Sequence, residues 1–271
     1  MAIITISRGT YAGGKEVASR LAEHLDYPVL SREKVLQEID RDYGIPEKTI
    51  NKTMNGAPPF WQQVPGKRLA YVKCITAAIL AHVKDGNLVY HGVNGHLLLA
   101  DLPQVLRVRI IANMEYRVEA LMKRATFSKE QAIAHIRQVS KDRSRWTKLL
   151  FNVDWKDPGL YDLILNLDKV STETACTAIA GMAEQKEFMP SPENRKALED
   201  FRLSCRVWAA LASNPATNSA GIRIKADDGE VVIAGTADSV KALELIPQAA
   251  GSVEGVRSVR CDIGVGTGWY W

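Results

Sequence analysis

The stretch that decides the fold is "ISRGTYAGGKEVASRLAEHL", residues 6–25. An apolar, β-branched run over residues 2–7 predicts a buried strand, and an amphipathic helix follows the glycine-rich turn. The spacing Gly9-x4-Gly14-Lys15 is that of a phosphate-binding loop, in which backbone N–H groups and a lysine hold the phosphates of a nucleotide. Glu16 stands where the general motif has Ser or Thr. The stretch therefore predicts a P-loop with one departure.

The loop supplies the nucleotide-binding candidates. They are Gly9, Thr10, Tyr11, Ala12, Gly13, Gly14, Lys15 and Glu16. We expect the N–H groups of residues 11–15 to converge on phosphate oxygens and Lys15 to reach the β- and γ-phosphates. The alternative is a glycine-rich turn without a ligand. For Glu16 two interpretations stay open, because its carboxylate either holds Mg²⁺ through water or repels the nucleotide.

Strands and helices alternate beyond this loop. Further strands are expected at residues 87–91, 106–112 and 161–167, and helices at 31–42, 67–84, 114–125, 128–150 and 171–186. This alternation predicts an α/β domain, a doubly wound parallel sheet, over residues 1–188. Lys52–Gly66 is rich in Pro and Gly and predicts an exposed loop, in which Phe60 and Trp61 either stack on a base or anchor the loop.

The pattern changes after a proline-containing linker at residues 187–194. A helix over 195–212, strands over 221–226 and 230–234, a helix over 237–250 and a strand over 256–263 predict a smaller α+β domain, with the order α-β-β-α-β, over residues 193–271. Asp227-Asp228-Gly229 between the first two strands is a strong hairpin signal.

Composition and charge limit the classes of protein to which the chain can belong. The 271 residues carry a net charge of +4, from 35 basic and 31 acidic residues, which is too mild for a dedicated nucleic-acid binder. The four cysteines are far apart and form no metal-binding spacing, so we expect no disulfide and no metal site. The N-terminus reads as a strand, not as a signal peptide, and no apolar run approaches the length of a membrane span. We expect a cytoplasmic protein.

A second group of candidates lies in the basic stretch near residue 140. Arg137, Lys141 and Arg145 are spaced i, i+4 and i+8, so they form one stripe on a helix, and Arg143 lies among them. Cations that close over a transferred phosphoryl group stabilise its negative charge, so these four are candidate catalytic residues. The alternative is a solvated charged face.

Residues 1–185 resemble the cytidylate kinase-like P-loop family. The resemblance rests on "ITISRGTYAGGKEVASRLAEHLDYPVLSREKV", on "LPQVLRVRIIANMEYRVEALMKRATFSKEQAIAHIRQVSKDRSRW" and on "DWKDPGLYDLILNLDKVSTETA". It implies a nucleoside monophosphate kinase fold with a five-stranded parallel core and a mobile lid. It also implies ATP as phosphoryl donor, Mg²⁺ supplied with it, and a CMP-like acceptor. Glu after the basic residue is common in that family.

The same resemblance assigns roles to residues outside the loop. Arg32 matches the arginine that approaches the acceptor nucleotide. Asn94 falls in another segment expected to bind that nucleotide, and the stretch around Arg143 matches the lid. Gly92, Val93 and Asn94 stand where cytidylate kinases have Gly-Arg-Asp. This departure favours an alternative function, a nucleotide-binding regulatory or sensor protein with little or no kinase turnover.

The C-terminal stretch "DDGEVVIAGTADSVKALELIPQAAGSVEGVRSVRCDI" resembles the BON domain. That family is associated with phospholipid or small-ligand binding. For this chain we expect nucleotides as ligands, no nucleic acid and no membrane as partners, and self-association or effector binding through residues 193–271, because an exposed strand edge is a pairing surface. The aromatic tail "GTGWYW" is expected at a protein contact.

Overall fold

The computed structural model describes residues 2–44, 65–92, 94–218 and 221–266. They form two compact units. The first holds residues 2–35, 82–92 and 94–191, and the second holds residues 36–44, 65–81 and 192–266 apart from 219–220. The expected loop over Lys52–Gly66 lies outside the described residues up to position 64, as do Phe60, Trp61 and the end of the aromatic tail. Residues 65 and 66 begin a helix.

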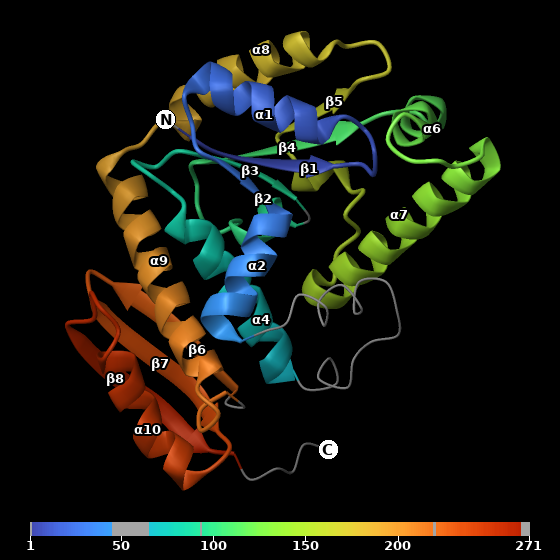
Figure 1. Ribbon diagram of the computed structural model, residues 1–271. Helices are drawn as coiled ribbons and strands as arrows, with labels where there is room; N and C mark the ends of the chain where they lie inside the picture. Colours follow the sequence, from blue (N-terminus) through green and yellow to red (C-terminus); the bar gives the residue numbers. More distant parts are fainter. Residues whose placement is uncertain (1, 45–64, 93, 219–220, 267–271) are drawn as a thin grey trace. The chain divides into compact units, whose positions relative to one another are not determined.

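A five-stranded parallel sheet forms the centre of the first unit, in the order β2-β3-β1-β4-β5 (Figure 1). The strands are β1 (Ile3–Arg8), β2 (Val29–Ser31), β3 (Leu88–Gly92), β4 (Val105–Ile111) and β5 (Leu163–Asn166). At the carboxyl end of the sheet, Ser7 lies opposite Gly92 of β3 and Arg109 of β4. The doubly wound parallel fold is confirmed, as is the five-stranded core. The short strand β2 was not expected.

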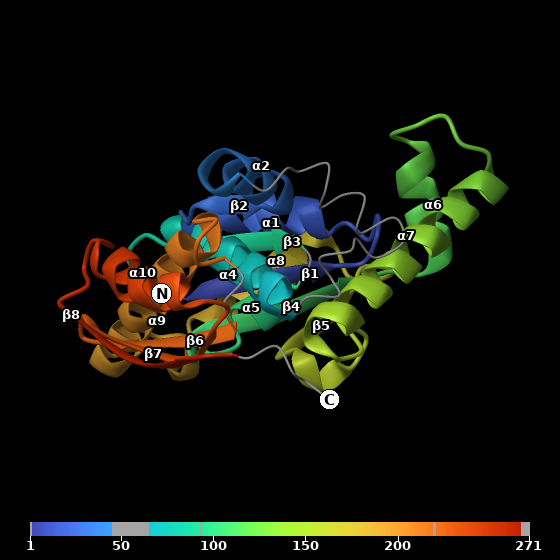
Figure 2. The ribbon, with the colours of Figure 1, turned by 90° about the horizontal axis from the view of Figure 1, so that it is seen from below.

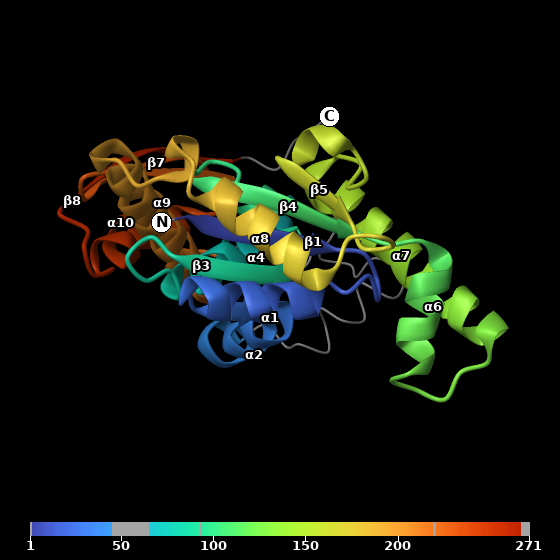
Figure 3. The ribbon, with the colours of Figure 1, turned by 90° about the horizontal axis from the view of Figure 1, so that it is seen from above.

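Two helices cover one face of this sheet. Figure 3 shows α1 (Gly14–Leu25) and α8 (Thr172–Ala183) side by side over the strands. Val17 and Leu21 of α1 and Ile179 of α8 are fully buried against Ile4 and Val108 of the sheet. Burial of large aliphatic side chains contributes roughly 1.5–3 kcal/mol each, so this layer fixes where α1 begins and therefore where the glycine-rich loop lies.

A helical hairpin follows β4. Its helices are α6 (Met114–Met122) and α7 (Lys129–Phe151), and Figure 2 shows them side by side. α7 begins with a capping box, in which Ser128 accepts from the Gln131 N–H and the Gln131 side chain accepts from the Ser128 N–H. Val118 and Ile136 pack in a small apolar cluster between the two helices. The hairpin thus has its own packing, separate from the layer under α1 and α8.

The remaining elements of the first unit are short. They are α5 (Gly95–Leu98) after β3, and the 3₁₀ turns η2 (Pro158–Leu160) and η3 (Lys186–Phe188). α2 (Arg32–Tyr43) begins in this unit, and its residues from Leu36 onward group with the second unit. Among the described helices, none is both long and apolar enough to cross a bilayer.

The second unit contains the expected α-β-β-α-β order. Its elements are α9 (Pro192–Ser213), β6 (Gly221–Asp227), β7 (Glu230–Ala237), α10 (Val240–Gly251) and β8 (Ser258–Val265), with the sheet order β6-β7-β8. Val207 and Leu211 of α9 and Ile246 of α10 are fully buried against Ile222 and Ile233 of the sheet. α4 (Pro65–Ala81) packs against α9 in the same unit, a grouping that the sequence did not predict. The boundaries 1–188 and 193–271 stay a prediction.

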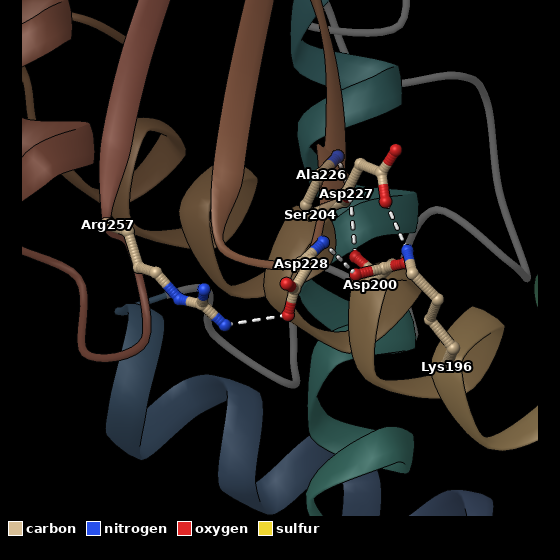
Figure 4. A network of polar contacts seen from close by, with 7 residues as sticks. All are labelled: Lys196, Asp200, Ser204, Ala226, Asp227, Asp228 and Arg257. Carbon is tan, nitrogen blue, oxygen red and sulfur yellow. Dashed lines mark hydrogen bonds and ion pairs between the residues drawn. The ribbon is translucent and has the colours of Figure 1, made fainter. Parts of the chain in front are cut away.

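Polar contacts tie the β6–β7 turn to α9 (Figure 4). Asp228 and Gly229 both have positive φ, as an Asp-Gly hairpin turn requires, at 46° and 83°. The Asp228 N–H donates to Asp200 at 2.7 Å, and the Ala226 N–H donates to the Ser204 hydroxyl at 2.8 Å. Side chains add to these bonds through two pairs, Lys196 with Asp227 and Arg257 with Asp228. The hairpin is therefore anchored to α9 at its turn and along β6.

Candidate active site

A cavity of about 270 Å³ lies over the glycine-rich loop in the first unit. The loop itself forms its floor, and charged side chains from β1, α2 and the α6–α7 hairpin form its walls. The lining residues are Arg8, Gly9, Thr10, Tyr11, Ala12, Gly13, Gly14, Lys15, Glu33, Arg124, Val139 and Arg143. Seven of the eight predicted loop residues thus line one cavity, and Glu16 does not.

The backbone of the loop depends on its glycines. Gly13 has a φ of 81°, and a Cβ there would come within 2.8 Å of the Leu167 side chain. A Cβ at Gly14 would come within 2.6 Å of the Arg8 Cβ. Tyr11 also has a positive φ, 60°, which is uncommon outside glycine. The loop therefore holds a tight path that larger residues at positions 13 and 14 would disturb.

The amino end of α1 faces the cavity without a side-chain cap. Gly13 is the N-cap and supplies no side-chain acceptor, whereas α6, α7, α8 and α10 are capped by the side chains of Asn113, Ser128, Ser171 and Ser239. The first N–H groups of a helix have no intrahelical acceptor, and the helix dipole adds partial positive charge at that end. The amides of Gly14 and Lys15 are therefore available to an anion.

Not every predicted amide is available. The Ala12 N–H donates to the Gly9 carbonyl oxygen at 3.1 Å, so it is already used inside the loop. The Gly9 N–H donates to the Ile110 carbonyl oxygen of β4 at 2.9 Å and fixes the start of the loop to the sheet. Phosphate contacts in this conformation would come from the other amides of the loop.

Two arginines of the hairpin hold the loop through its carbonyl groups. Arg143 Nη1 donates to the Arg8 carbonyl oxygen at 2.8 Å, and Arg117 Nε donates to the Thr10 carbonyl oxygen at 2.7 Å. Arg117 Nη2 also donates to the Ser140 hydroxyl of α7 at 3.1 Å. These bonds link α6 and α7 directly to the glycine-rich loop.

The charges around Arg143 repel one another. Burial lowers the pKa of Arg143 to about 10, and repulsion from Arg8, Arg32 and Arg117 adds to that decrease. Burial also lowers the pKa of Arg117. A bound anion would relieve this repulsion, so the arginines fit a negatively charged ligand.

A single carboxylate balances these cations in the cavity wall. Glu33 accepts from Arg8 Nη2 at 3.1 Å. Burial acts to raise the pKa of Glu33, but a backbone hydrogen bond and the charge of Arg8 outweigh it and lower the pKa. The cavity is therefore lined by four cations, Arg8, Lys15, Arg124 and Arg143, against one carboxylate.

The four basic residues predicted on α7 separate into two groups. Arg143 lines the cavity, whereas Arg137, Lys141 and Arg145 are exposed and do not line it. Asp142 is buried and accepts from the Gln138 amide at 3.0 Å, so it faces away from the exposed stripe. In this conformation of the hairpin, only one of the four predicted lid cations reaches the loop.

The carboxylate of Glu16 points along the outer face of α1. It accepts from Arg20 Nη2 at 2.9 Å, and the two side chains are 49% and 59% exposed. This position disfavours both interpretations of Glu16, because the carboxylate lies outside the cavity in which Mg²⁺ or a phosphate would bind.

The two residues predicted to bind the acceptor nucleotide differ in burial. Arg32 is partly buried at the first position of α2, next to Glu33 of the cavity wall. Asn94 is buried, with a φ of 65°, and its side-chain oxygen accepts from the Thr147 hydroxyl at 2.8 Å. Asn94 therefore joins the turn after β3 to α7 and does not line the cavity. Val93 lies outside the described residues.

Other polar residues serve the packing of the sheet. His96 stacks on Tyr161, with ring centroids 4.6 Å apart, and Asp162 accepts from Arg107 Nε at 3.1 Å. Burial lowers the pKa of His91 to about 4 and that of His96 to about 3. In the described part of the chain, no three His, Cys, Asp or Glu side chains gather as a metal site would need. All four cysteines are free thiols.

Four charged residues of the site were not predicted from the sequence. They are Arg8, Glu33, Arg117 and Arg124. Arg8 ends β1 immediately before the loop, Glu33 is the second residue of α2, Arg117 lies on α6, and Arg124 lies in the turn after α6. Single charged residues at such positions are too common to be singled out without the fold.

Comparisons with known proteins identify the family of this chain. The family model described as "Cytidylate kinase-like family" matches residues 3–169, more than half of the chain. The chain belongs to the cytidylate kinase-like family. The model of the BON domain matches residues 199–267.

Curated relatives are named cytidylate kinase. A protein of Methanothrix thermoacetophila named cytidylate kinase is 26% identical over 165 residues, which are 60% of this chain and 87% of the relative. A protein of Methanopyrus kandleri with the same name is 25% identical over 175 residues, 63% of this chain and 87% of the relative. The crystal structure of an uncharacterized protein from Eubacterium ventriosum is similar in fold, with a TM-score of 0.54 and 23% identity. The match covers 68% of this chain and 98% of that protein's chain.

The residues present fit a nucleotide triphosphate. The uncapped amino end of α1, the ammonium of Lys15 and the guanidinium groups of Arg124 and Arg143 converge on one cavity. Phosphate oxygens accept from all of these donors. Glu33 is the single carboxylate of the lining and already accepts from Arg8, so Mg²⁺ would arrive bound to the phosphates.

Proposed function

We propose that this chain transfers a phosphoryl group from ATP to a nucleoside monophosphate, with a CMP-like molecule as the acceptor. One observation carries the proposal, namely four cations against one carboxylate around the uncapped amino end of α1. The names of the curated relatives support the choice of acceptor.

Each part of the cavity has a role in this reaction. The free amides of the loop and Lys15 would bind the β- and γ-phosphates. Arg124 and Arg143 come from the hairpin and would stabilise the charge on the transferred group. Mg²⁺ bound with ATP would neutralise part of the charge on the phosphates. Arg32, at the start of α2, would bind the phosphate of the acceptor.

A coupled assay with CMP, dCMP, UMP, AMP and GMP tests the proposal. We expect the highest kcat/KM with CMP. Lys15→Ala should lower kcat/KM by about 100-fold or more, and Arg124→Ala by about 10-fold, because each removes charge stabilisation of the transition state. Lys123→Ala is the matched control, since Lys123 is exposed, adjacent to Arg124 and outside the cavity. Wild-type turnover no faster than that of Lys15→Ala would overturn the proposal.

A second candidate function is a nucleotide-binding regulatory protein with little or no turnover. Asn94 favours it, because this residue stands at the Asp position of Gly-Arg-Asp and its side chain bonds to Thr147. Calorimetry with ATP and a non-hydrolysable analogue separates the two functions, because tight binding without turnover supports the regulator. Val93→Arg combined with Asn94→Asp should then raise turnover, since Asp tolerates a positive φ and still accepts from Thr147.

A further inference from the structure

Among the described residues, the two edges of the sheet in the second unit differ in their hydrogen-bond partners. At the β6 edge, the Ser204 hydroxyl of α9 accepts from the Ala226 N–H at 2.8 Å (Figure 4). At the other edge lies β8, which pairs with β7 in parallel over eight consecutive residues. No described strand pairs with the outer side of β8. β8 also lacks proline and lysine, which commonly protect exposed edges.

The two faces of β8 differ in chemistry. Val259 and Ile263 pack partly against the core of the second unit. Arg260 and Asp262 alternate with them and are exposed on the opposite face. Their neighbours on β7 are Val232 and Ala234, and no described residue forms an ion pair with either charge. The edge therefore carries one free positive and one free negative charge, two residues apart.

The charges on β8 would complement those of a second β8 strand if a two-fold axis passed at Cys261. In an antiparallel pair with a two-fold axis at Cys261, Arg260 lies opposite Asp262 of the partner subunit, and Val259 lies opposite Ile263 of the partner subunit. The two Cys261 residues face each other. Moving the axis to Arg260 or Asp262 would place like charges opposite each other, which is destabilising. One register therefore satisfies both charges and continues the apolar row.

We propose that two copies of this chain pair through β8, antiparallel about Cys261, and form one continuous six-stranded sheet. The partner is a second copy because both halves of the complementarity are present on one strand, as an isologous two-fold contact requires. The contact involves one strand from each copy, so the dimer should dissociate on dilution. The alternative is that Arg260 and Asp262 only prevent other strands from pairing with this edge. In that case their charges need not be complementary, and the protein would be a monomer.

Charge reversal in the full chain tests the register. Sedimentation velocity over a concentration series should show a monomer–dimer equilibrium for the wild type. Arg260→Asp and Asp262→Arg should each raise the dimer dissociation constant by at least about 10-fold, because each sets like charges opposite each other. The double variant, Arg260→Asp with Asp262→Arg, should restore dimerisation. Arg223→Asp, on the exposed face of β6, is the matched control and should have no effect.

A thiol cross-link tests the position of the axis. Directly opposed Cα atoms in an antiparallel pair are about 4.5–5.5 Å apart, within the range that a disulfide spans. Diamide, which takes up the two protons and two electrons that the thiols release, should yield a reducible dimer. Cys261→Ser should abolish it, since the other three cysteines are buried. A wild type that stays monomeric, a double variant that fails to restore the dimer, or a cross-link that survives Cys261→Ser would each overturn the proposal.

Discussion

Arg143 differs from Arg137, Lys141 and Arg145 of α7 because it is partly buried and bonded to the Arg8 carbonyl oxygen, immediately before the glycine-rich loop. Arg143→Ala removes both a cation and the bond to the Arg8 carbonyl group. We expect ATP affinity to fall by about 10-fold or more, given that hydrogen bonds to charged groups contribute about 1.5–3 kcal/mol. Arg137→Ala, on the exposed stripe, should bind ATP as the wild type does. Equal losses in the two variants, measured by calorimetry, would contradict the division of the stripe into two groups.

His96 should make stability depend on pH. Neither of its ring nitrogens has a hydrogen-bond partner among the described residues, and burial lowers its pKa to about 3. The unfolded chain, with a histidine pKa near 6.5, binds more protons between these values, so the free energy of unfolding falls as the pH falls from about 6.5. His96 alone would contribute up to about 2 kcal/mol between pH 7 and pH 5. His96→Phe keeps an aromatic ring beside Tyr161 and should flatten this dependence in urea unfolding at the two pH values. An unchanged slope would contradict the prediction.

The sequence predicted the loop of the site better than its walls. The Gly9-x4-Gly14-Lys15 spacing is local, and a strand before it and a helix after it leave little freedom in its path. The walls depend on where the α6–α7 hairpin lies. The helical period correctly placed Arg137, Lys141 and Arg145 on one stripe, but which face meets the loop is a tertiary property.

Among the elements, α9 supplies a hydrogen-bond acceptor to the outer edge of β6, through the Ser204 hydroxyl. Ser204→Ala would leave the buried Ala226 without the acceptor of its N–H, which costs about 1–3 kcal/mol. Ser213→Ala is the control, because the Ser213 hydroxyl bonds only within α9, to the Ala209 carbonyl oxygen. We expect a clear loss of stability for the first variant and little for the second, with faster amide exchange at Ala226. Similar stability losses in both would argue against an edge held by Ser204.

Most elements were predictable because their patterns are local. Asp228-Gly229 fixed the β6–β7 hairpin, and the periodic apolar residues fixed the long helices to within a few residues. β2 was missed, since Val29–Ser31 is too short to show alternation. The grouping of α4 with α9 was also missed, because contacts between residues more than a hundred positions apart leave no periodic signal in one sequence.

At the scale of the whole molecule, the second unit is built from three described stretches of chain, residues 36–44, 65–81 and 192–266 apart from 219–220. α4 packs against α9, and the Lys73 ammonium lies 5.2 Å from the centre of the Phe201 ring. A chymotryptic cut after Phe188, between η3 and α9, would therefore leave α4 and α9 packed against each other. We expect the two fragments to elute together in size-exclusion chromatography under native conditions and to separate in urea, because the packing between α4 and α9 is not covalent. Fragments that separate without denaturant would show that residues 192–266 fold without α4, and that the boundary expected near residue 190 is a complete division of the chain.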